Sequence, residues 1–385
     1  MLLFVALLAL AGCAGQTAGS GGQEPRPIET GGSETTRDAA AEETNSSGAA
    51  GGGTPSPTRV EVSTLATGLR VPWSFAFLPD GDALVTERDT GRILRVAASG
   101  EAREVQTLPE GGTGEGGLLG IAVSPEYERD RYVYAYTTTR SDNRVVRFRL
   151  GEEPEAILTG IPVNSYHNGG RIAFGPDGML YVTTGDAGNP ANSQDKNSLG
   201  GKILRVEPDG SVPPDNPFPS SHVYSLGHRN IQGLAWDAQG QLFASEFGQD
   251  TWDEANRIDA GENYGWPEVE GEGGEGRGFA DPITVWPTSE ASPSGAEILV
   301  NGAIPQWEGD LFVTALRGES LWRLDLDEGG DVVGRERLLE GEAGRLRDVA
   351  RAPDGSLWVS TSNRDGRGTP VGNDDRIFRL APAGQ

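Results

Sequence analysis

The sequence contains one cysteine and three histidines, and its 32 lysines and arginines are outnumbered by 57 aspartates and glutamates. A single cysteine excludes a disulfide within the chain. The net charge of −25 argues against a nucleic-acid-binding protein, because phosphate binding needs clustered lysines and arginines. The sequence also lacks the patterns HExxH, GxSxG and CxxC, so no transition-metal site or activated nucleophile stands out.

The apolar run at the N-terminus, residues 1–10, is too short to span a bilayer. It leads into Leu10-Ala11-Gly12-Cys13, a pattern typical of a secretion signal that ends in a lipoprotein box. We therefore expect residues 1–12 to be a signal peptide and Cys13 to be acylated. The protein would be exported and held at the membrane only through this lipid, on the periplasmic or outer-surface side.

Residues 14–58 contain no aromatic residue and are rich in Gly, Ser, Thr, Ala and Glu. Such a segment cannot bury enough apolar surface to offset the entropy lost on ordering. We predict a flexible tether over residues 13–58, followed by a single domain over residues 59–385. The acidic surface of that domain could attract cations such as calcium, or could simply keep the protein soluble.

The domain repeats one phrase: a short apolar run, a turn such as Pro-Asp-Gly, and a second apolar run. Proline presets φ, aspartate caps the turn and glycine takes the left-handed conformation, so each copy predicts a β-hairpin. Four copies are clear and two are degenerate. The clear copies occupy residues 74–87, 171–186, 233–247 and 348–362, and the degenerate copies occupy residues 120–137 and 302–316.

Six such repeats without helices predict an all-β fold, a six-bladed β-propeller of four-stranded antiparallel blades. A spacing of about 50–55 residues per blade suits a four-stranded blade. A propeller brings the same end of every blade to one channel mouth. The start of each first strand and the end of each second strand should lie at this mouth, because the two strands are antiparallel.

Counted from the turns, four arginines are predicted to lie at the mouth: Arg229, Arg317, Arg345 and Arg347. Guanidinium groups bind carboxylates in a bidentate manner, so the cluster favours a ligand with several carboxylates. The alternative is that each arginine pairs with a neighbouring carboxylate and only ties the blades together. We favour the ligand, because four arginines gather at one mouth of an acidic protein.

His167 is predicted to lie at the same mouth, just before Asn168-Gly169-Gly170, which lets the backbone approach a ligand closely. Imidazole exchanges protons near neutral pH, so His167 is a candidate general base, with a structural histidine as the alternative. The acidic segment 246–266 could supply oxygen ligands to calcium, or could be a solvated loop.

Six strings in this domain together resemble the soluble quinoprotein family of glucose/sorbosone and aldose sugar dehydrogenases, which depend on pyrroloquinoline quinone (PQQ). The resemblance covers about residues 60–380, and the strings follow the family's order. They are GGLLGIAVSPEY, HNGGRIAFGPDGMLYVTTGD, GHRNIQGLAWD, DEANRIDAGENYGWP, FVTALRGESLWRL and GRLRDVARAPDGSLWVST.

The resemblance implies an oxidoreductase that acts on aldose sugars. The family's catalytic base falls on His167, which would take the proton from the anomeric hydroxyl while hydride passes to C5 of the quinone, giving a lactone. The family's contacts to the tricarboxylate cofactor fall on Glu115, Arg229, Asn230, Arg317, Arg345 and Arg347. The resemblance also places one calcium on the backbone carbonyls of Gly248 and Gln249, and a second on the Glu254 side chain and the Tyr264 carbonyl.

The chain departs from the family's usual pattern at three places, one of which is residues 267–285, Gly- and Glu-rich and without a match for the tyrosine that follows NYGW in the family. Glu115 stands where the family often has glutamine, and Phe247-Gly248-Gln249 stands where it often has His-Gly-Pro. A carboxylate at position 115 would repel an anionic cofactor unless it is protonated or faces calcium.

Two other functions stay open at this point. One is a calcium-dependent propeller lactonase or esterase, built on Glu115, Asp186 and Glu246. The other is a non-catalytic propeller that binds a carbohydrate or a protein. The sequence identifies neither the sugar nor the electron acceptor.

Overall fold

The computed structural model describes residues 58–109 and 112–384. The predicted signal peptide (1–12), Cys13 and nearly all of the predicted tether (13–58) lie outside the described residues and stay predictions. Within the described ranges, no helix combines the length and the apolar character needed to cross a membrane.

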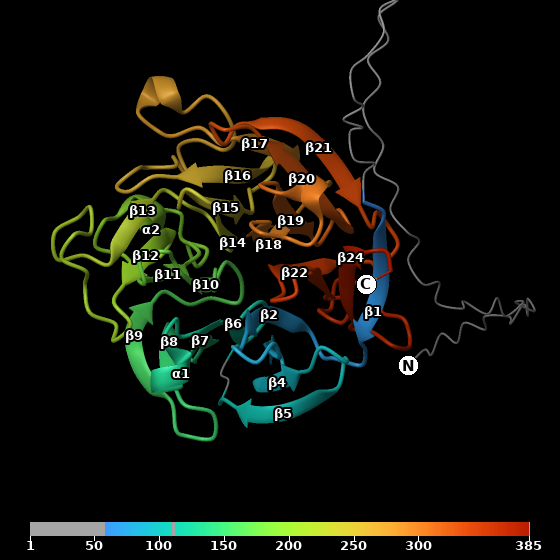
Figure 1. The fold of residues 1–385 in the computed structure, drawn as a ribbon. Helices are drawn as coiled ribbons and strands as arrows, with labels where there is room; N and C mark the ends of the chain where they lie inside the picture. The colour runs from blue at the N-terminus through green and yellow to red at the C-terminus, as the bar shows by residue number, and fades with distance from the viewer. Residues whose placement is uncertain (1–57, 110–111, 385) are drawn as a thin grey trace, which may run out of the picture.

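The described residues form a ring of six four-stranded antiparallel sheets, with the first strand of each blade nearest the centre (Figure 1). The prediction of a six-bladed β-propeller is therefore confirmed. Blade 1 contains β2 (Pro72–Phe77), β3 (Ala83–Glu87), β4 (Arg92–Val96) and β5 (Ala102–Thr107), and blade 2 contains β6 (Leu118–Val123), β7 (Val133–Thr138), β8 (Asn143–Phe148) and β9 (Glu155–Ile161). Blade 3 contains β10 (Ile172–Phe174), β11 (Leu180–Thr183), β12 (Lys202–Val206) and β13 (Val223–Leu226), and blade 4 contains β14 (Ile231–Trp236), β15 (Leu242–Glu246), β16 (Trp252–Ile258) and β17 (Thr284–Pro287).

Blades 5 and 6 complete the ring. Blade 5 contains β18 (Pro293–Ile298), β19 (Leu311–Ala315), β20 (Ser320–Leu326) and β21 (Val332–Leu338), and blade 6 contains β22 (Leu346–Arg351), β23 (Leu357–Thr361), β24 (Ile377–Pro382) and β1 (Val60–Ala66). Short helices lie in four connections: α1 (Tyr127–Asp130), α2 (Ala191–Gln194), η1 (Glu275–Arg277) and η2 (Pro305–Trp307).

The repeated phrase forms the hairpin between the first two strands of a blade. In blade 3, for example, Gly178 has a φ of +80° and donates its amide hydrogen to the Gly175 carbonyl at 3.0 Å. A side chain would be strained at this φ, which explains the glycine. Blade 5 corrects the expectation for residues 302–316: its first strand is β18, and Pro305 instead opens the short helix η2 in the connection.

The inner strands are buried because each blade packs between two neighbours. All residues of β3, β7 and β23 are buried, whereas most of β5, at the rim, is exposed. One apolar cluster includes Tyr134 of blade 2 together with Ile172 and Leu204 of blade 3, and so joins these two blades. Packing between blades therefore fixes the relative positions of the loops at the mouth.

Blade 6 contains both ends of the described domain. β1 pairs antiparallel with β24, with Val60 opposite Pro382 and Val62 opposite Leu380. Figure 1 shows blue β1 outside red β24. One sheet thus closes the ring with strands from the two ends of the domain, a feature that the repeats alone did not predict.

Candidate functional site

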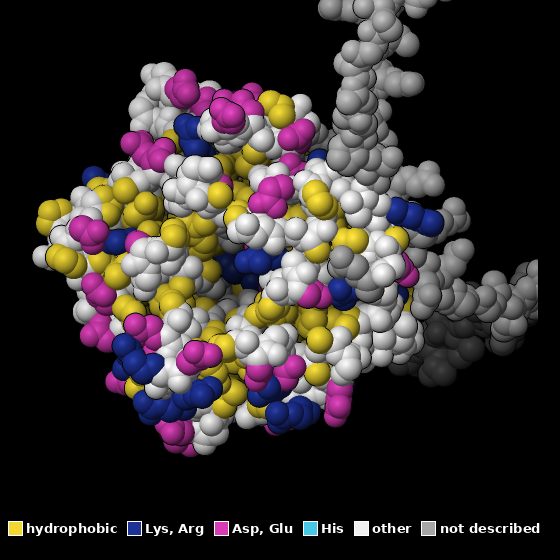
Figure 2. All heavy atoms as spheres, in the orientation of Figure 1, with side chains coloured by type: hydrophobic (Ala, Val, Ile, Leu, Met, Phe, Trp, Pro, Cys, Tyr) yellow, Lys and Arg dark blue, Asp and Glu magenta, His cyan; other side chains and the backbone are white. Residues whose placement is uncertain are grey.

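Two adjoining cavities of about 530 and 360 Å³ open at one end of the propeller axis. All six blades or their connections line the larger cavity. Figure 2 shows basic side chains at the bottom of the central hollow. The two cavities form one continuous site, because they share five lining residues: Glu115, Phe247, Ser292, Arg317 and Arg367.

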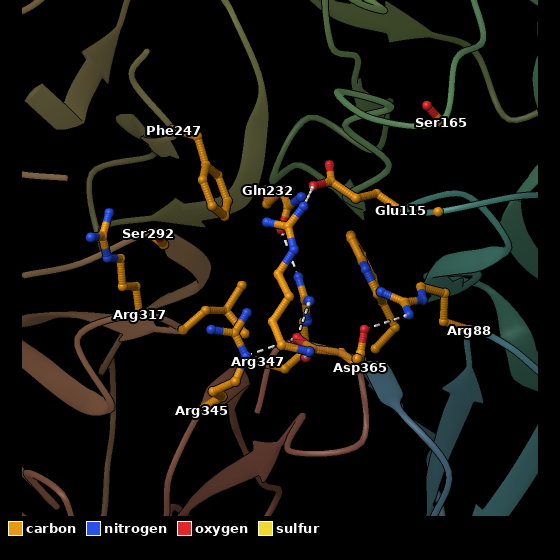
Figure 3. A pocket seen from close by; sticks show the side chains of 15 residues that line it. Arg88, Glu115, Ser165, Gln232, Phe247, Ser292, Arg317, Arg345, Arg347 and Asp365 are labelled. Carbon is orange, nitrogen blue, oxygen red and sulfur yellow. Dashed lines mark hydrogen bonds and ion pairs between the residues drawn. The ribbon is translucent and has the colours of Figure 1, made fainter. Parts of the chain in front are cut away.

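Arg345 and Arg347 lie on one wall of the larger cavity and share the carboxylate of Asp365 (Figure 3). Nε of Arg345 donates to Oδ2 of Asp365 at 2.9 Å, and Nη2 of Arg347 lies 3.7 Å from the same oxygen. Burial alone would raise the pKa of Asp365, but the two guanidinium charges hold it below its ordinary value. One carboxylate between two guanidinium groups leaves this wall positively charged.

The guanidinium of Arg347 is buried and only partly hydrogen-bonded. Its Nη1 donates to Oε1 of Gln232 at 2.8 Å, and its central carbon lies 5.9 Å from the centre of the Trp73 ring. Its Nε has no hydrogen-bond partner among the described residues. Burial lowers the pKa of Arg347 to about 9. A buried cation with a free donor is suited to an anionic ligand.

Arg229 and Asn230 lie in the connection between β13 and β14. Oδ1 of Asn230 accepts the N–H of Gly169 at 2.9 Å, which ties the loop that carries His167 to blade 4. Nε of Arg229 donates to Oε1 of Gln249 at 3.1 Å. Burial lowers the pKa of Arg229, although nearby carboxylates oppose the shift.

Arg317 and Arg88 add two further cations to the lining of the larger cavity. Arg317 follows β19 and is exposed, and its guanidinium has no partner among the described residues. Arg88 follows β3, and its Nε pairs with Oδ1 of Asp89 at 2.6 Å. The counted turn positions had placed Arg317 on this face.

His167 lines the smaller cavity and is oriented by Asp186. Nδ1 of His167 lies 2.7 Å from Oδ1 of Asp186, and Oδ2 of Asp186 accepts the indole N–H of Trp266 at 3.0 Å. Burial alone would raise the pKa of Asp186, but the hydrogen bond and charge of His167 hold it below its ordinary value. An ionised carboxylate only accepts, so the hydrogen between the two groups lies on Nδ1, and in the neutral imidazole the lone pair is then on Nε2.

The backbone around His167 is also fixed by neighbouring groups. His167 has a φ of +56°, in the left-handed region that residues other than glycine seldom adopt. Its N–H donates to Oε2 of Glu115 at 3.1 Å, and its carbonyl accepts the N–H of Ala187 at 3.1 Å. Oε1 of Glu115 pairs with Nη2 of Arg367 at 2.9 Å, so this carboxylate faces a cation.

Gly248 and Gln249 lie in the loop between β15 and β16 and line the smaller cavity. Their carbonyl oxygens accept no hydrogen bond from the described residues. Oε1 of Glu270 accepts the four backbone N–H groups of residues 249–252 at 2.7–3.2 Å and so fixes the loop. Among the described residues, no group of three His, Cys, Asp or Glu side chains is placed to hold a metal, so a cation here would need carbonyl oxygens.

Glu254 is a buried carboxylate of β16 without a cationic side chain as partner in the described part of the chain. It accepts the N–H of Gly271 at 2.7 Å and a side-chain N–H of Asn256 at 3.1 Å. Burial, reinforced by the charges of Glu246 and Glu270, raises the pKa of Glu254 to about 8. A bound cation would relieve this accumulation of negative charge.

Tyr264 lies beyond β16 in the same blade as Glu254. Its ring stacks on the imidazole of His228 at 4.7 Å, and its carbonyl accepts no hydrogen bond from the described residues. Nδ1 of His228 lies 2.8 Å from Oε2 of Glu246, whose other oxygen accepts the backbone N–H of Arg229. Tyr264 thus supports the segment that carries Arg229.

Comparison with known proteins decides the family. The sequence profile for glucose/sorbosone dehydrogenases matches residues 69–370. The chain is a member of the glucose/sorbosone dehydrogenase family. A PQQ-bound aldose sugar dehydrogenase from Streptomyces coelicolor shares 53% identity and a TM-score of 0.78, over 84% of this chain and 99% of that chain.

Two further relatives carry sugar dehydrogenase names. Quinoprotein glucose dehydrogenase B of Acinetobacter calcoaceticus is 30% identical, over 77% of this chain and 84% of its own length. An aldose sugar dehydrogenase of Escherichia coli is 29% identical, over 81% of this chain and 92% of its own length. The predicted family is therefore confirmed, and it is a family of oxidoreductases.

In this glucose/sorbosone dehydrogenase family member, the carboxylates of the alternative hydrolase site do not converge. Glu115, Asp186 and Glu246 are each engaged by a different basic side chain. The geometry therefore offers no joint calcium site for these three carboxylates in the described part of the chain.

Sequence reasoning missed Asp365, Trp266 and Arg367 as parts of the site. Asp365 and Arg367 lie four and six residues beyond Thr361, the last residue of β23, whose end was predicted to lie at the mouth. Both residues would have been found if the count of positions had been continued from the end of β23 into the loop that follows it. Trp266 ends the NYGW string, but no spacing in the sequence connects its indole to Asp186, 80 positions earlier.

Proposed function

We propose that this protein catalyses the PQQ- and calcium-dependent oxidation of aldose sugars at the anomeric carbon, giving lactones. The charge of the larger cavity carries the proposal. Five arginines and two carboxylates line it, an excess of three positive charges in a chain with a net charge of −25. A tricarboxylate such as PQQ matches this excess, because guanidinium groups pair strongly with carboxylates.

The residues present fit such a cofactor. The cavity volume of about 530 Å³ is in the ordinary range for small-molecule sites. Arg317 has a free guanidinium, and Nε of Arg347 is a buried donor that needs an acceptor. The proposed cofactor-binding residues are Glu115, Arg229, Asn230, Arg317, Arg345 and Arg347. When bound, PQQ supplies the two-electron acceptor for the hydride.

His167 is the proposed general base. Its Nε2 takes the proton from the hydroxyl on C1 of the sugar, while the hydride on C1 leaves for the acceptor and the C1–O bond becomes the carbonyl of the lactone. The resulting imidazolium is stabilised by Asp186, 2.7 Å from Nδ1. The indole of Trp266 keeps the carboxylate in place from its other side.

Tyr166 is the proposed contact for the sugar ring. Its side chain is 42% exposed beside the base, and its ring lies edge-on to the imidazole of His167 with 4.7 Å between centres. Both residues line the smaller cavity. An aromatic face there can cover the apolar face of a pyranose while His167 reaches its C1 hydroxyl.

Calcium is proposed at two places. The free carbonyls of Gly248 and Gln249 would hold one ion beside the cofactor, where it acts as a Lewis acid. Glu254 and the carbonyl of Tyr264 would hold a second, structural ion. The raised pKa of Glu254 supports this, since a carboxylate crowded by other carboxylates gains most from a nearby cation.

We also propose that the enzyme acts outside the cytoplasmic membrane, held there by a lipid on Cys13. The support is the Leu-Ala-Gly-Cys sequence at residues 10–13, which begins with the last residue of a ten-residue apolar run. The electron acceptor that reoxidises the cofactor is unknown.

The experiment uses the full chain, purified without cofactor and then mixed with PQQ and calcium. Reduction of a redox dye is followed with a panel of aldoses. We expect turnover that requires both additions. Lactone hydrolysis without PQQ would instead support the hydrolase, and absence of PQQ binding and of both activities would support the non-catalytic binding module.

A further inference from the structure

Glu115 and Arg367 join two loops across the mouth of the site. Nη2 of Arg367 lies 2.9 Å from Oε1 of Glu115, although the residues are 252 positions apart in sequence. Glu115 precedes blade 2, and Arg367 follows the second strand of blade 6. Both residues line both cavities. Figure 3 shows Glu115 reaching into the larger cavity from the side opposite Arg345.

The guanidinium of Arg367 has capacity for a second partner. Only Nη2 of this group forms a hydrogen bond with the described residues, so Nε and Nη1 stay available. The side chain is 66% exposed, and a single ion pair at such exposure is weak and leaves the side chain mobile. Its backbone is better fixed, because the N–H of Arg367 donates to Oδ1 of Asp365 at 2.9 Å.

Glu115 needs a counter-charge whenever an anion fills the cavity. Its carboxylate cannot turn away freely, because Oε2 accepts the backbone N–H of His167 at 3.1 Å and its side chain is only 26% exposed. An anionic ligand and this carboxylate would repel each other across the same cavity. A glutamine at this position would keep the hydrogen bond to His167 without that repulsion.

We propose that Arg367 is a further carboxylate-binding residue of this site, and that it acts as a bridge between Glu115 and the ligand. One edge of the guanidinium neutralises Glu115, and the remaining N–H groups bind a carboxylate of the cofactor. The inference rests on the proposed function, since it takes PQQ as the ligand. It explains how this chain tolerates a carboxylate at position 115 beside an anionic ligand.

The test measures PQQ affinity directly, by fluorescence titration of the full chain in the presence of calcium. The variants are Arg367→Gln, Glu115→Gln and the double variant. Arg364→Gln is the matched control, because it removes one charge from the same loop and its exposed side chain contacts the carbonyl of Asp374. Thermal unfolding of each variant checks that the fold is retained.

We expect Arg367→Gln to weaken PQQ binding by about tenfold or more, as for loss of a charge-assisted hydrogen bond, and Arg364→Gln to change it by less than about twofold. In the Glu115→Gln background, the factor by which Arg367→Gln weakens PQQ binding should be at least about threefold smaller. In that background no carboxylate at position 115 is left without a counter-charge.

Equal affinities of Arg367→Gln and Arg364→Gln would overturn the inference while leaving the proposed function intact. An equal loss in both backgrounds would overturn the bridge, because Arg367 would then act independently of Glu115. If the wild-type chain itself binds no PQQ, the proposed function fails and this inference fails with it.

Discussion

His167 and Asp186 are the residues on which the proposed chemistry depends most. A carboxylate on Nδ1 fixes the imidazole ring, which lines the smaller cavity, and leaves Nε2 without a hydrogen-bond partner among the described residues. The left-handed backbone at His167 is maintained by hydrogen bonds from both neighbouring loops. Strain of this kind is typical of functional sites, where the surrounding structure holds a residue in a conformation it would not choose.

Asp186→Asn should lower kcat by about 10²- to 10⁴-fold, because the base loses the group that orients it and stabilises its charged form. PQQ affinity should stay within about twofold of wild type, since Asp186 lines neither cavity. Steady-state kinetics with an aldose and a redox dye measure the first quantity, and PQQ titration measures the second. The control is Asp195→Asn, an exposed carboxylate in the following connection. A kcat equal to that of the control would contradict the role of Asp186.

Joint replacement of Arg345 and Arg347 by alanine should weaken PQQ binding by several kcal/mol, since each charge-assisted pair contributes about 1.5–3 kcal/mol. Isothermal titration measures the loss. Arg129→Ala with Arg149→Ala removes the same charge from exposed positions on blade 2 and should have little effect. Unchanged binding in the first variant would move the cofactor elsewhere.

At this scale the sequence identified the arginines and His167, because their distance from each turn is set by the length of the inner strand. It did not identify Asp365 as the partner of two arginines. The loop after β23 is not part of the repeat, so its path depends on contacts with other loops, such as the hydrogen bonds from Arg88 to the Asp365 carbonyl and from Asn363 to the Ala343 carbonyl. The alternative that each arginine pairs with a carboxylate holds for Arg345 and Arg347, but Asp365 belongs to their own blade, so these ion pairs do not tie two blades together.

Among the elements, the hairpins were the easiest to predict and the connections the hardest. A Pro-Asp-Gly turn specifies both its conformation and the register of the strands on either side. The degenerate copy in blade 5 shows where this prediction fails. Residues 302–310 are apolar enough to be predicted as a strand, but Pro305 starts a short helix. The pairing of β1 with β24 left no signal in the repeat, because β1 lies outside the repeated hairpins.

Glu254 of β16 leads to a prediction about how the stability of the fold depends on pH and calcium. The folded-state pKa of Glu254, about 8, lies above its unfolded value of 4.5, so without calcium the folded state binds the extra proton between these values. This contribution to stability is complete below pH 4.5 and is lost as pH rises toward 8. In calcium-free buffer we expect the unfolding midpoint to fall by a few degrees over this range, since about 1 kcal/mol shifts it by about 2 °C.

Glu254→Gln should reduce this pH dependence, and it should also reduce the stabilisation that added calcium gives at pH 8. Differential scanning calorimetry with and without a chelator measures both effects. Glu262→Gln, an exposed position in the connection after β16, is the matched control. If the Glu254 variant keeps the wild-type slope and the wild-type calcium response, a cation at this carboxylate is ruled out.

The whole molecule combines a strongly acidic chain with a positively charged axial cavity. Figure 2 shows both acidic and basic side chains around the rim, and basic ones in the central hollow. The sheet of blade 6 contains strands from both ends of the domain and closes the ring. This closure holds all six blades around the cavity. The number of blades could be predicted by counting the repeats. The net positive charge of the cavity could not be predicted, because it depends on which carboxylates line the cavity beside the arginines.

Cys13→Ser should release the protein from the membrane, because one cysteine provides the only thiol for lipid attachment. Fractionation of cells that express the wild-type and variant chains measures the membrane-bound share. We expect wild type in the membrane fraction and the variant in the soluble exported fraction. Identical distributions would contradict the anchor without affecting the proposed chemistry.

The central claim is that His167 takes a proton from an aldose beside PQQ held by the arginine-lined cavity. The most direct test mixes PQQ- and calcium-loaded wild type and His167→Ala with excess aldose under anaerobic conditions and follows the cofactor spectrum. The account predicts rapid reduction in the wild type, and in the variant equal PQQ affinity with reduction slower by at least about 10²-fold. Reduction at the wild-type rate in His167→Ala would contradict it.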